Sequence, residues 1–181
     1  IIRDYHAKRR WLSVPEIFMY SSNIGAAKMA MAVGTNAQRK FLSSLGLLTP
    51  SPIELPEVGA PIKPKSWSTS TTMTVSFGHG IAVSSLQMAS AVAAIVNDGV
   101  YIPPTLLKRG RDDVALEERR VVSKKTSHEM RRLLRLVVER GTGKRANADG
   151  YLVGGKTGTA EKQEAGRYVR NKLISSFVAA F

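Results

Sequence analysis

Apolar residues first recur at helical spacing near residue 13. Ser13 and Glu16 have the spacing of a capping box, in which each side chain pairs with the other residue's backbone, so we predict that a helix begins there. The polar triplet Ser21-Ser22-Asn23 interrupts the pattern, and a second apolar run follows over residues 24–33, which Gly34 can close. The pattern therefore predicts two helices joined by a polar turn.

The next part of the chain shows little regular patterning. A short helix is expected over Gln38–Leu45, and residues 49–80 then hold five of the eight prolines and a cluster of Ser and Thr. Such a segment can link two domains, but the apolar residues on both sides need partners, and long ordered loops also occur within single domains. We interpret residues 49–80 as an irregular surface excursion within one domain.

A helix buried on all sides is predicted after this excursion. Ser84 and Gln87 form another capping box, and the stretch Ile81–Asn97 contains no charged residue. Apolar residues recur at helical spacing within it, so we expect a helix that lies in the core and ends at Gly99.

The last predicted helix is amphipathic. Thr126 and Glu129 are expected to cap its start, and Gly141 to end it. The residues expected to face the core are Met130, Leu133, Leu134, Val137 and Val138. Those expected to project outward are Arg131, Arg132 and Arg135.

The C-terminal end of the chain is patterned as two strands. Tyr151–Ala160 and Leu173–Phe181 are rich in β-branched, aromatic or small residues, and the polar stretch Glu161–Lys172 separates them as a loop. Helices followed by strands at one end favour an α+β fold in which helices pack on a mostly antiparallel sheet.

The charge of the chain leaves a choice open. Its net charge is +13, and residues 108–145 alone carry 13 basic and 6 acidic side chains. A basic module that binds nucleic acid would show such an excess, but aromatic residues make up only 7% of the chain and lie mostly in apolar runs. A solvated basic face is the interpretation we favour, and we expect no nucleic acid partner.

The composition also argues against some kinds of site. The chain has no cysteine, and its three histidines lie far apart, which argues against a metal site or a disulfide framework. No cofactor is expected. The most apolar helical run, Leu86–Val96, falls short of the ~20 residues that a bilayer requires.

Two short motifs carry the candidate chemistry. Lys156-Thr157-Gly158-Thr159 follows Gly154-Gly155 on a predicted strand, so a cation and two hydroxyls stand on backbone that a ligand can approach closely. Ser21-Ser22-Asn23 occupies the turn between two helices. Each motif alone is weak, because glycines in strands often mark only tight packing, and Ser and Asn favour helix caps for local reasons.

Together the two motifs resemble those of the penicillin-recognising enzymes. The resemblance extends to flanking strings, and within this class it is similar to the class B penicillin-binding proteins, most of all to the septal, division-specific type, which has asparagine at the third motif position. The strings that carry it are Val14-Pro15-Glu16, Tyr20-Ser21-Ser22-Asn23-Ile24-Gly25, Phe77-Gly78-His79-Gly80-Ile81, Gly141-Thr142-Gly143 and Lys156-Thr157-Gly158-Thr159-Ala160-Glu161-Lys162.

This resemblance implies a fold, an activity and a set of site residues. The fold would be that of the serine transpeptidases and β-lactamases, truncated, and the activity the cross-linking of peptidoglycan stem peptides that end in D-Ala-D-Ala through an acyl-serine intermediate. Ser21 would join a proton relay, Asn23 would hold the substrate amide, and Lys156 would stay protonated and attract the substrate carboxylate. The residues implied to bind that carboxylate or keep the strand open to it are Thr157, Gly158 and Thr159.

The nucleophile of the family is not found in this sequence. Its motif is S-x-x-K, and no serine of the chain is followed by lysine three positions later. We therefore expect residues 1–181 to be the C-terminal part of a transpeptidase domain, with the first motif upstream and the last strand and C-terminal helix open to lying beyond it. By itself the chain is expected to be inactive.

The resemblance also implies partners and a location. Stem peptides and β-lactam antibiotics would bind the site, and a septal glycosyltransferase and other division proteins would assemble with the enzyme. The location would be the periplasmic face of the bacterial inner membrane, with an anchor outside these residues. A β-lactamase, a carboxypeptidase or a β-lactam sensor shares the motifs and remains the alternative, because only the acceptor of the acyl group separates them.

Overall fold

A computed structural model of the chain describes residues 1–110, 117–164 and 167–181. The described residues form α1 (Val14–Tyr20), α2 (Asn23–Val33), α3 (Thr35–Ser44), α4 (Thr69–Val75), α5 (Ser85–Val96), β1 (Val100–Tyr101), β2 (Arg119–Arg120), α6 (Lys124–Arg140), the short 3-10 helix η1 (Lys144–Ala146), β3 (Gly154–Glu164) and β4 (Arg167–Ala180).

The α1 capping box is present as predicted. The backbone N–H and the hydroxyl of Ser13 both donate to Glu16 Oε2, at 2.9 and 3.0 Å. The hydrogen bond from Arg10 and those from Ser13 lower the pKa of Glu16 to about 2. The start of α1 is thus held by an ionised carboxylate.

Of two other predicted helix starts, the one at α5 is confirmed and the one at α6 is wrong. At α5, Ser84 and Gln87 bond each other's backbone at 3.2 and 3.0 Å, as expected. At α6, the expected Thr126 cap is wrong, because the Thr126 N–H donates to Ser123 Oγ at 3.1 Å and the helix begins at Lys124. Ser and Thr both suit an N-cap chemically, so residue type alone did not decide between Ser123 and Thr126.

Helix α4 lies inside the stretch that we expected to be irregular. Five of the seven residues of Thr69–Val75 are Ser or Thr, which have low helix propensity, and Met73 and Val75 alone make no apolar stripe. One tertiary contact supports the helix here, because the fully buried Thr72 hydroxyl lies 2.9 Å from Thr35 Oγ1. Its other neighbour is local, since the Ser68 carbonyl at 3.1 Å belongs to the residue that caps the same helix. The expectation of an irregular 49–80 segment was therefore wrong at its end.

The two C-terminal strands form an antiparallel hairpin, as predicted, but they are longer than expected. Gly154 pairs with Ala180 at one end and Glu164 with Arg167 at the other, with a register shift after Glu161. The expected loop Glu161–Lys172 is thus mostly strand, and residues 165–166 lie outside the described part of the chain. Strand pairing joins backbone N–H and C=O groups, so it can continue past the apolar run that hydropathy marks. The short pair β1–β2 was not predicted.

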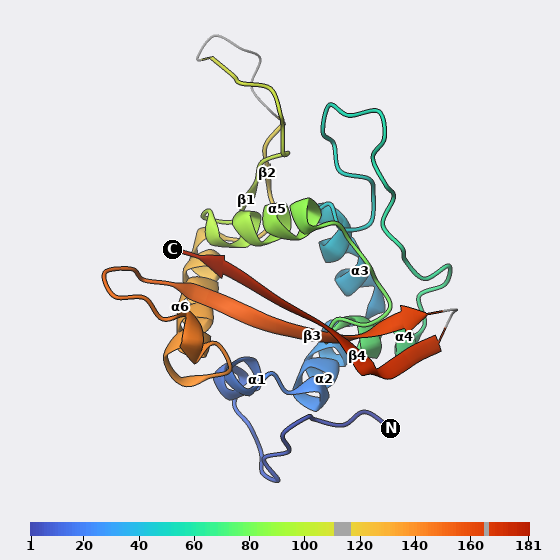
Figure 1. Cartoon of the computed structure of the whole chain (residues 1–181), viewed down its shortest axis with the longest axis vertical. Helices are drawn as coiled ribbons and strands as arrows, with labels where there is room; N and C mark the ends of the chain where they lie inside the picture. The colour runs from blue at the N-terminus through green and yellow to red at the C-terminus, as the bar shows by residue number, and fades with distance from the viewer. Residues whose placement is uncertain (111–116, 165–166) are drawn as a thin grey trace.

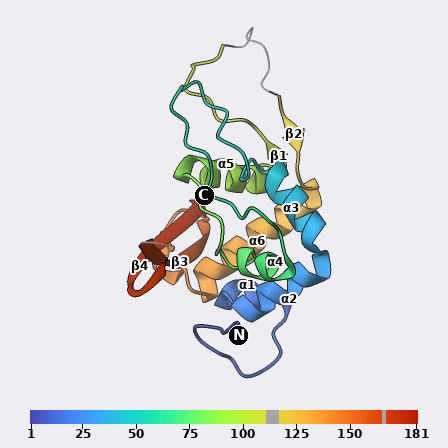
Figure 2. The same cartoon turned by 90° about the vertical axis from the view of Figure 1, so that its right-hand side faces the viewer.

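The helices form one layer and the β3–β4 hairpin lies on one side of it (Figures 1 and 2). Helix α6 links the two, since it contacts β3, α1 and α5. Its predicted apolar stripe is confirmed at Leu134, Val137 and Val138, which are buried. Arg131 and Arg132 are exposed as expected, whereas Arg135 turns back and donates to the carbonyl of Val153 at 2.9 Å.

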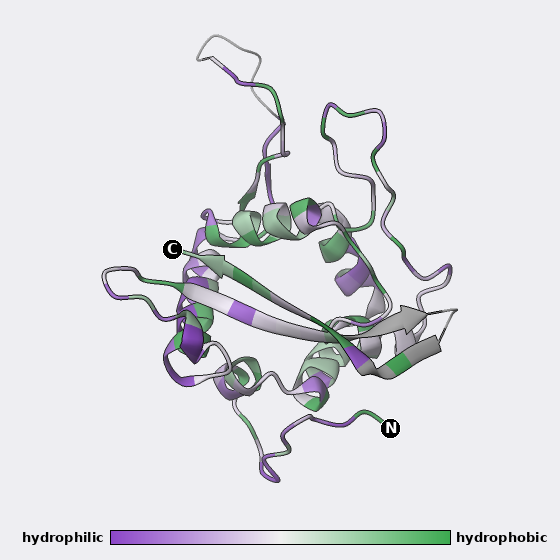
Figure 3. Ribbon diagram, viewed as in Figure 1, coloured by the Kyte–Doolittle hydropathy of each residue, from purple (hydrophilic) through white to green (hydrophobic). Residues whose placement is uncertain are grey.

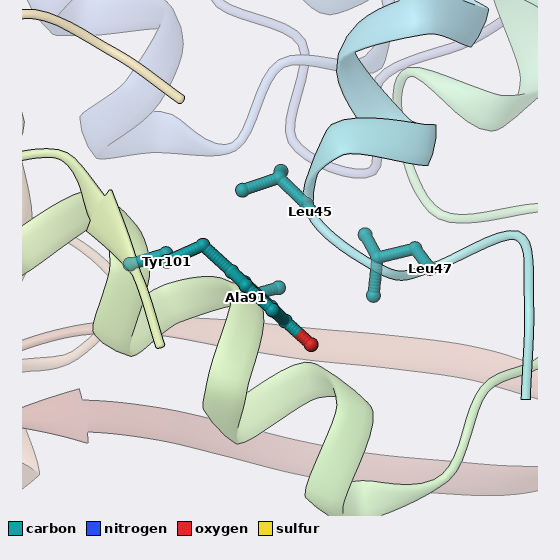
Figure 4. Close-up of a cluster of buried hydrophobic side chains, with 5 residues drawn as sticks. Leu45, Leu47, Ala91 and Tyr101 are labelled. Carbon is teal, nitrogen blue, oxygen red and sulfur yellow. The ribbon is translucent and has the colours of Figure 1, made fainter. Parts of the chain in front are cut away.

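The main cluster of buried apolar side chains lies between α3, α5 and β1 (Figure 4). It consists of Leu45, Leu47, Ala91, Ala94 and Tyr101. Gln87 is also buried here and donates to the carbonyls of Gly46 and Thr49, at 3.1 and 2.8 Å. This amide ties the start of α5 to the chain that leaves α3.

Helix α5 is not buried on all sides as we expected. Leu86 and Met88 are 37% and 41% exposed, and Figure 3 shows hydrophobic colour along its visible side. Apolar composition alone does not reveal which side of a helix is covered. No helix in the described residues has the length and apolar character needed to cross a bilayer.

Candidate active site

The structure brings together two residues that the motifs single out. Lys156 Nζ donates a hydrogen bond of 2.7 Å to Ser21 Oγ, although the two residues are 135 positions apart in the sequence. Ser21 ends α1, and Lys156 is the third residue of β3. The contact therefore joins the helical layer to the hairpin at the predicted site.

The backbone of the α1–α2 turn aims Ser21 at the strand. Ser21 has φ 57° and ψ 49°, the left-handed conformation that costs energy for a residue with a side chain. Ser22 follows as the N-cap of α2, where its hydroxyl accepts from the Gly25 N–H at 3.0 Å. Gly25 is needed, since a Cβ there would lie 2.6 Å from Ile17 of α1.

Asn23 lies on the same turn but makes a different contact. It is the first residue of α2, and its Nδ2 donates to the backbone carbonyl of Arg3 at 3.0 Å. With its amide nitrogen engaged there, Asn23 keeps Oδ1 as an acceptor. No described contact joins Asn23 to β3, so its expected role toward a substrate amide stays a prediction.

The environment of Lys156 makes its charged form less favourable than it is in water. The side chain is partly buried, and this burial lowers the pKa of Lys156. Its second hydrogen bond goes to the carbonyl of Thr157 at 3.0 Å. Within the residues that the structure describes, no salt bridge includes Lys156, so hydroxyl and carbonyl oxygens are its recorded partners.

Thr157 meets a residue that sequence reasoning did not count among the site residues. Its hydroxyl lies 2.7 Å from the hydroxyl of Thr142, in the loop that follows α6. Close packing places this loop: a Cβ on Gly141 would lie 2.6 Å from the carbonyl of Met19 in α1. The flanking glycines of Gly141-Thr142-Gly143 were the available sign that Thr142 sits at a crowded, constrained position.

The remaining motif residues lie along β3. Gly158 pairs with Ser176 and Thr159 with Ser175 on β4, and Thr159 is exposed. Of the described strands, only β4 pairs with β3, which leaves the other edge of β3 without a partner strand. The expected open backbone beside Lys156 is therefore available on that edge.

The contact joins a polar S-x-N turn to the lysine of a K-T-G-T strand, and motifs of these two kinds occur together in β-lactamases and penicillin-binding proteins. The family model for the penicillin binding protein transpeptidase domain matches residues 1–181, and the chain belongs to this family. The expected family and fold class are thus confirmed.

Relatives agree with this membership. The chain is 41% identical to a probable peptidoglycan D,D-transpeptidase FtsI of Caulobacter vibrioides, over 99% of this chain and 31% of that protein. It is 35% identical to a probable peptidoglycan D,D-transpeptidase PenA of Neisseria meningitidis, over 98% of this chain and 30% of that protein. The chain thus spans about a third of the length of these relatives.

Solved structures are similar as well. The transpeptidase domain of penicillin-binding protein 3 from Burkholderia pseudomallei matches with a TM-score of 0.85 and 37% identity, over 93% of this chain and 51% of that one. Penicillin-binding protein 3 of Mycobacterium tuberculosis, solved in complex with aztreonam, matches with a TM-score of 0.85 and 32% identity, over 92% of this chain and 41% of that one.

Proposed function

We propose that the protein containing this chain is a serine-type peptidoglycan D,D-transpeptidase of septal cell-wall synthesis, and that residues 1–181 supply its second and third motifs. The observation that carries the proposal is the 2.7 Å hydrogen bond from Lys156 Nζ to Ser21 Oγ. It places a cation, a hydroxyl and an open strand edge side by side, as acyl transfer to and from a peptide requires.

The strand residues would bind the substrate. The terminal carboxylate of a stem peptide would lie against β3, where Lys156 provides positive charge and the Thr157 and Thr159 hydroxyls donate hydrogen bonds. Gly158 leaves room for that approach. The backbone N–H of Thr159 would serve as one donor of the oxyanion hole, which stabilises the tetrahedral intermediate.

Ser21 and Lys156 would move the proton. In the first step the nucleophilic serine of an S-x-x-K segment, outside these residues, attacks the carbonyl between the two D-alanines. The serine oxygen bonds to the carbonyl carbon, the C–N bond breaks, and the proton that the serine loses reaches the leaving amine through the Ser21 hydroxyl. A buried lysine with a lowered pKa can donate to this hydroxyl at smaller cost than a solvated one. An amine of a second stem peptide then attacks the ester, a new C–N bond replaces the C–O bond, and the proton that the amine loses returns to the serine oxygen.

We also propose ligands, partners and a cellular location for the enzyme. β-Lactams would acylate the same serine, as expected for relatives such as the aztreonam complex above. The enzyme would act at the periplasmic face of the inner membrane, anchored by a segment outside these residues. It would work with a septal glycosyltransferase and other division proteins.

Covalent labelling by a fluorescent penicillin tests the proposal. We expect a longer polypeptide that begins upstream of an S-x-x-K segment to be labelled, and the 181-residue chain not to be. Lys156→Ala in the longer form should lower the labelling rate by about 100-fold or more. Lys125→Ala changes an exposed lysine of α6 and is the matched control.

Three results would contradict the proposal: no labelling of a folded longer form, labelling of the 181-residue chain, or equal rates for Lys156→Ala and Lys125→Ala. The fate of the acyl-enzyme separates the alternatives of the same fold. Rapid hydrolysis of the bound penicillin would indicate a β-lactamase, whereas a long-lived adduct together with cross-linking of stem peptides would indicate a transpeptidase.

A further inference from the structure

The segment before α1 returns to the turn that carries the second motif. The carboxylate of Asp4 accepts from the Ser22 hydroxyl at 2.9 Å through Oδ2 and at 3.1 Å through Oδ1. The same Oδ1 accepts from the backbone N–H of Ile24 at 3.0 Å. One side chain therefore bonds both the cap residue and the first turn of α2.

The neighbouring residue extends this contact. Arg3 accepts from Asn23 Nδ2 through its backbone carbonyl at 3.0 Å. Three consecutive residues, Ser22, Asn23 and Ile24, are thus each bonded to Arg3 or Asp4. The bond to Asn23 also fixes which end of its amide points away, so that Oδ1 stays free to accept a substrate N–H.

The Ser22 hydroxyl depends on Asp4 for its direction. Ser22 is 6% exposed, and its oxygen already accepts from the Gly25 N–H. Its single proton goes to the Asp4 carboxylate, which completes the hydrogen bonding of a buried group. A carboxylate at the start of an eleven-residue helix is also favoured by the helix dipole.

This arrangement is directly connected to the candidate active site. Ser21 precedes Ser22 and holds a left-handed conformation, while its hydroxyl receives the hydrogen bond from Lys156. A shift of Ser22 and Ile24 away from Asp4 would move Ser21 with them, because the backbone is continuous. Displacements of about 1 Å at a catalytic group can reduce rates by about 100-fold.

We propose that Asp4 is a positioning residue of the active site, which holds the Ser21–Asn23 turn in register with Lys156. This inference rests on the proposed transpeptidase function and adds a residue outside the three family motifs. Asp4 touches neither Lys156 nor the motif strand in the described contacts, so it acts through Ser22 and Ile24.

The test uses the full-length protein and measures two constants for a fluorescent penicillin, the affinity of the first non-covalent complex and the rate of acylation within it. Asp4→Ala should lower the acylation rate by roughly 10-fold to 100-fold. The affinity of Asp4→Ala for penicillin in the non-covalent complex should change by less than about threefold, because the strand that binds the carboxylate is unaltered. Asp4→Asn retains one acceptor oxygen, so its acylation rate should lie between those of the wild type and Asp4→Ala.

Two further variants make the test specific. Asp149→Asn changes an exposed acidic residue in the loop before β3 and should leave both constants unchanged. In a Ser22→Ala background, adding Asp4→Ala should cost much less than it does alone, because the two residues act as a unit.

Several outcomes would overturn the inference. One is an unchanged acylation rate in Asp4→Ala, and another is full additivity with Ser22→Ala. Loss of folding in both Asp4→Ala and Asp4→Asn, measured by thermal unfolding, would assign Asp4 to stability alone. These outcomes are separate from a failure of the proposed function, which would appear as no labelling of the native protein.

Discussion

The two halves of the candidate site are held in place by opposite means. The α1–α2 turn is positioned by polar side chains, since Ser22 caps α2 and donates to Asp4. The strand β3 is positioned where side chains are missing, because Gly154 and Gly155 allow close approach to α6 and β4. The turn should therefore be sensitive to the loss of hydroxyl groups, and the strand to the addition of carbon atoms.

The distances at the strand show how tight its fit is. A Cβ on Gly155 would lie 2.4 Å from the Phe177 ring and 2.6 Å from the Val178 carbonyl. A Cβ on Gly154 would lie 3.1 Å from the backbone nitrogen of Arg135. At Gly158, by contrast, the nearest atom is the Ser176 hydroxyl at 2.6 Å, which can rotate away. The first two positions therefore set where Lys156 stands.

The largest expected effect comes where the two halves meet. Ser21→Ala and Lys156→Met should each lower the acylation rate of the full-length protein by about 100-fold to 1000-fold. Because the two groups form one hydrogen-bonded relay, the double variant should be little worse than either single variant. Stopped-flow acylation by a penicillin measures all three rates. If the rate loss in the double variant equalled the product of the two single losses, the two halves would act independently.

Lys156 should also make the stability of the folded chain depend on pH. Burial lowers the pKa of Lys156 in the folded chain below the ordinary value of 10.5, which applies to the unfolded chain. Between these two pKa values the unfolded chain binds more protons than the folded chain. The folded state should therefore gain stability as the pH rises through that window toward 10.5, and should carry the cost of the buried charge below it. The difference in unfolding free energy between wild type and Lys156→Met, measured across this range, should show the rise. Parallel curves would contradict it.

A methyl group on the strand should have the next largest effect. Gly155→Ala places a carbon against Phe177 and a backbone carbonyl, and overpacking of this kind costs about 1–3 kcal/mol. Gly59→Ala is the control, since no atom lies within 4 Å of its Cβ position. Chemical denaturation of the two variants measures the difference. Equal stability would mean that β4 moves aside freely, and that missing side chains do not position the strand.

The sequence predicted the parts of the fold that local patterns encode. Capping spacings located α1 and α5, the 3.6-residue stripe located α6, and β-branched runs located the hairpin. Helix α4 was missed because its residues form no apolar stripe, and because the partner of its buried Thr72 hydroxyl, Thr35, is far away in the chain. The ends of β3 and β4 were missed because pairing between backbones does not depend on hydropathy.

The site could be predicted in its motifs but not in its supports. Ser21 and Lys156 were recognisable because the motif pair is specific to one class of enzyme, and the structure places them in contact. Asp4 carries no such sign, since a lone Asp in a loop is common, and the glycines beside Thr142 mark a constrained position without giving it a role. Their importance comes from contacts with Ser22 and Thr157, and only the folded chain brings these pairs together.

A smaller effect is expected from the helix cap in the turn. Ser22→Ala removes the acceptor for the Gly25 N–H and the donor to Asp4, and losing an N-cap costs about 1 kcal/mol of stability. Ser70→Ala, at an exposed position of α4, is the matched control and should change stability very little. Thermal unfolding measures both. If Ser22→Ala were as stable as Ser70→Ala, polar side chains would not be what positions the turn.

The smallest expected effect is at the loop hydroxyl beside the strand. Thr142→Val keeps the shape of the side chain but removes its hydrogen bond to Thr157, and neutral hydrogen bonds contribute about 1 kcal/mol. When Thr142 donates to Thr157, the Thr157 proton is free to point at a bound carboxylate. We therefore expect Thr142→Val to weaken the non-covalent penicillin complex by roughly fivefold with little change in acylation rate. Thr142→Ser, which keeps the hydroxyl, should restore the affinity. If the serine variant were as weak as the valine variant, the hydrogen bond alone would not account for the affinity, and packing of the Thr142 methyl group would matter as well, as packing does at β3.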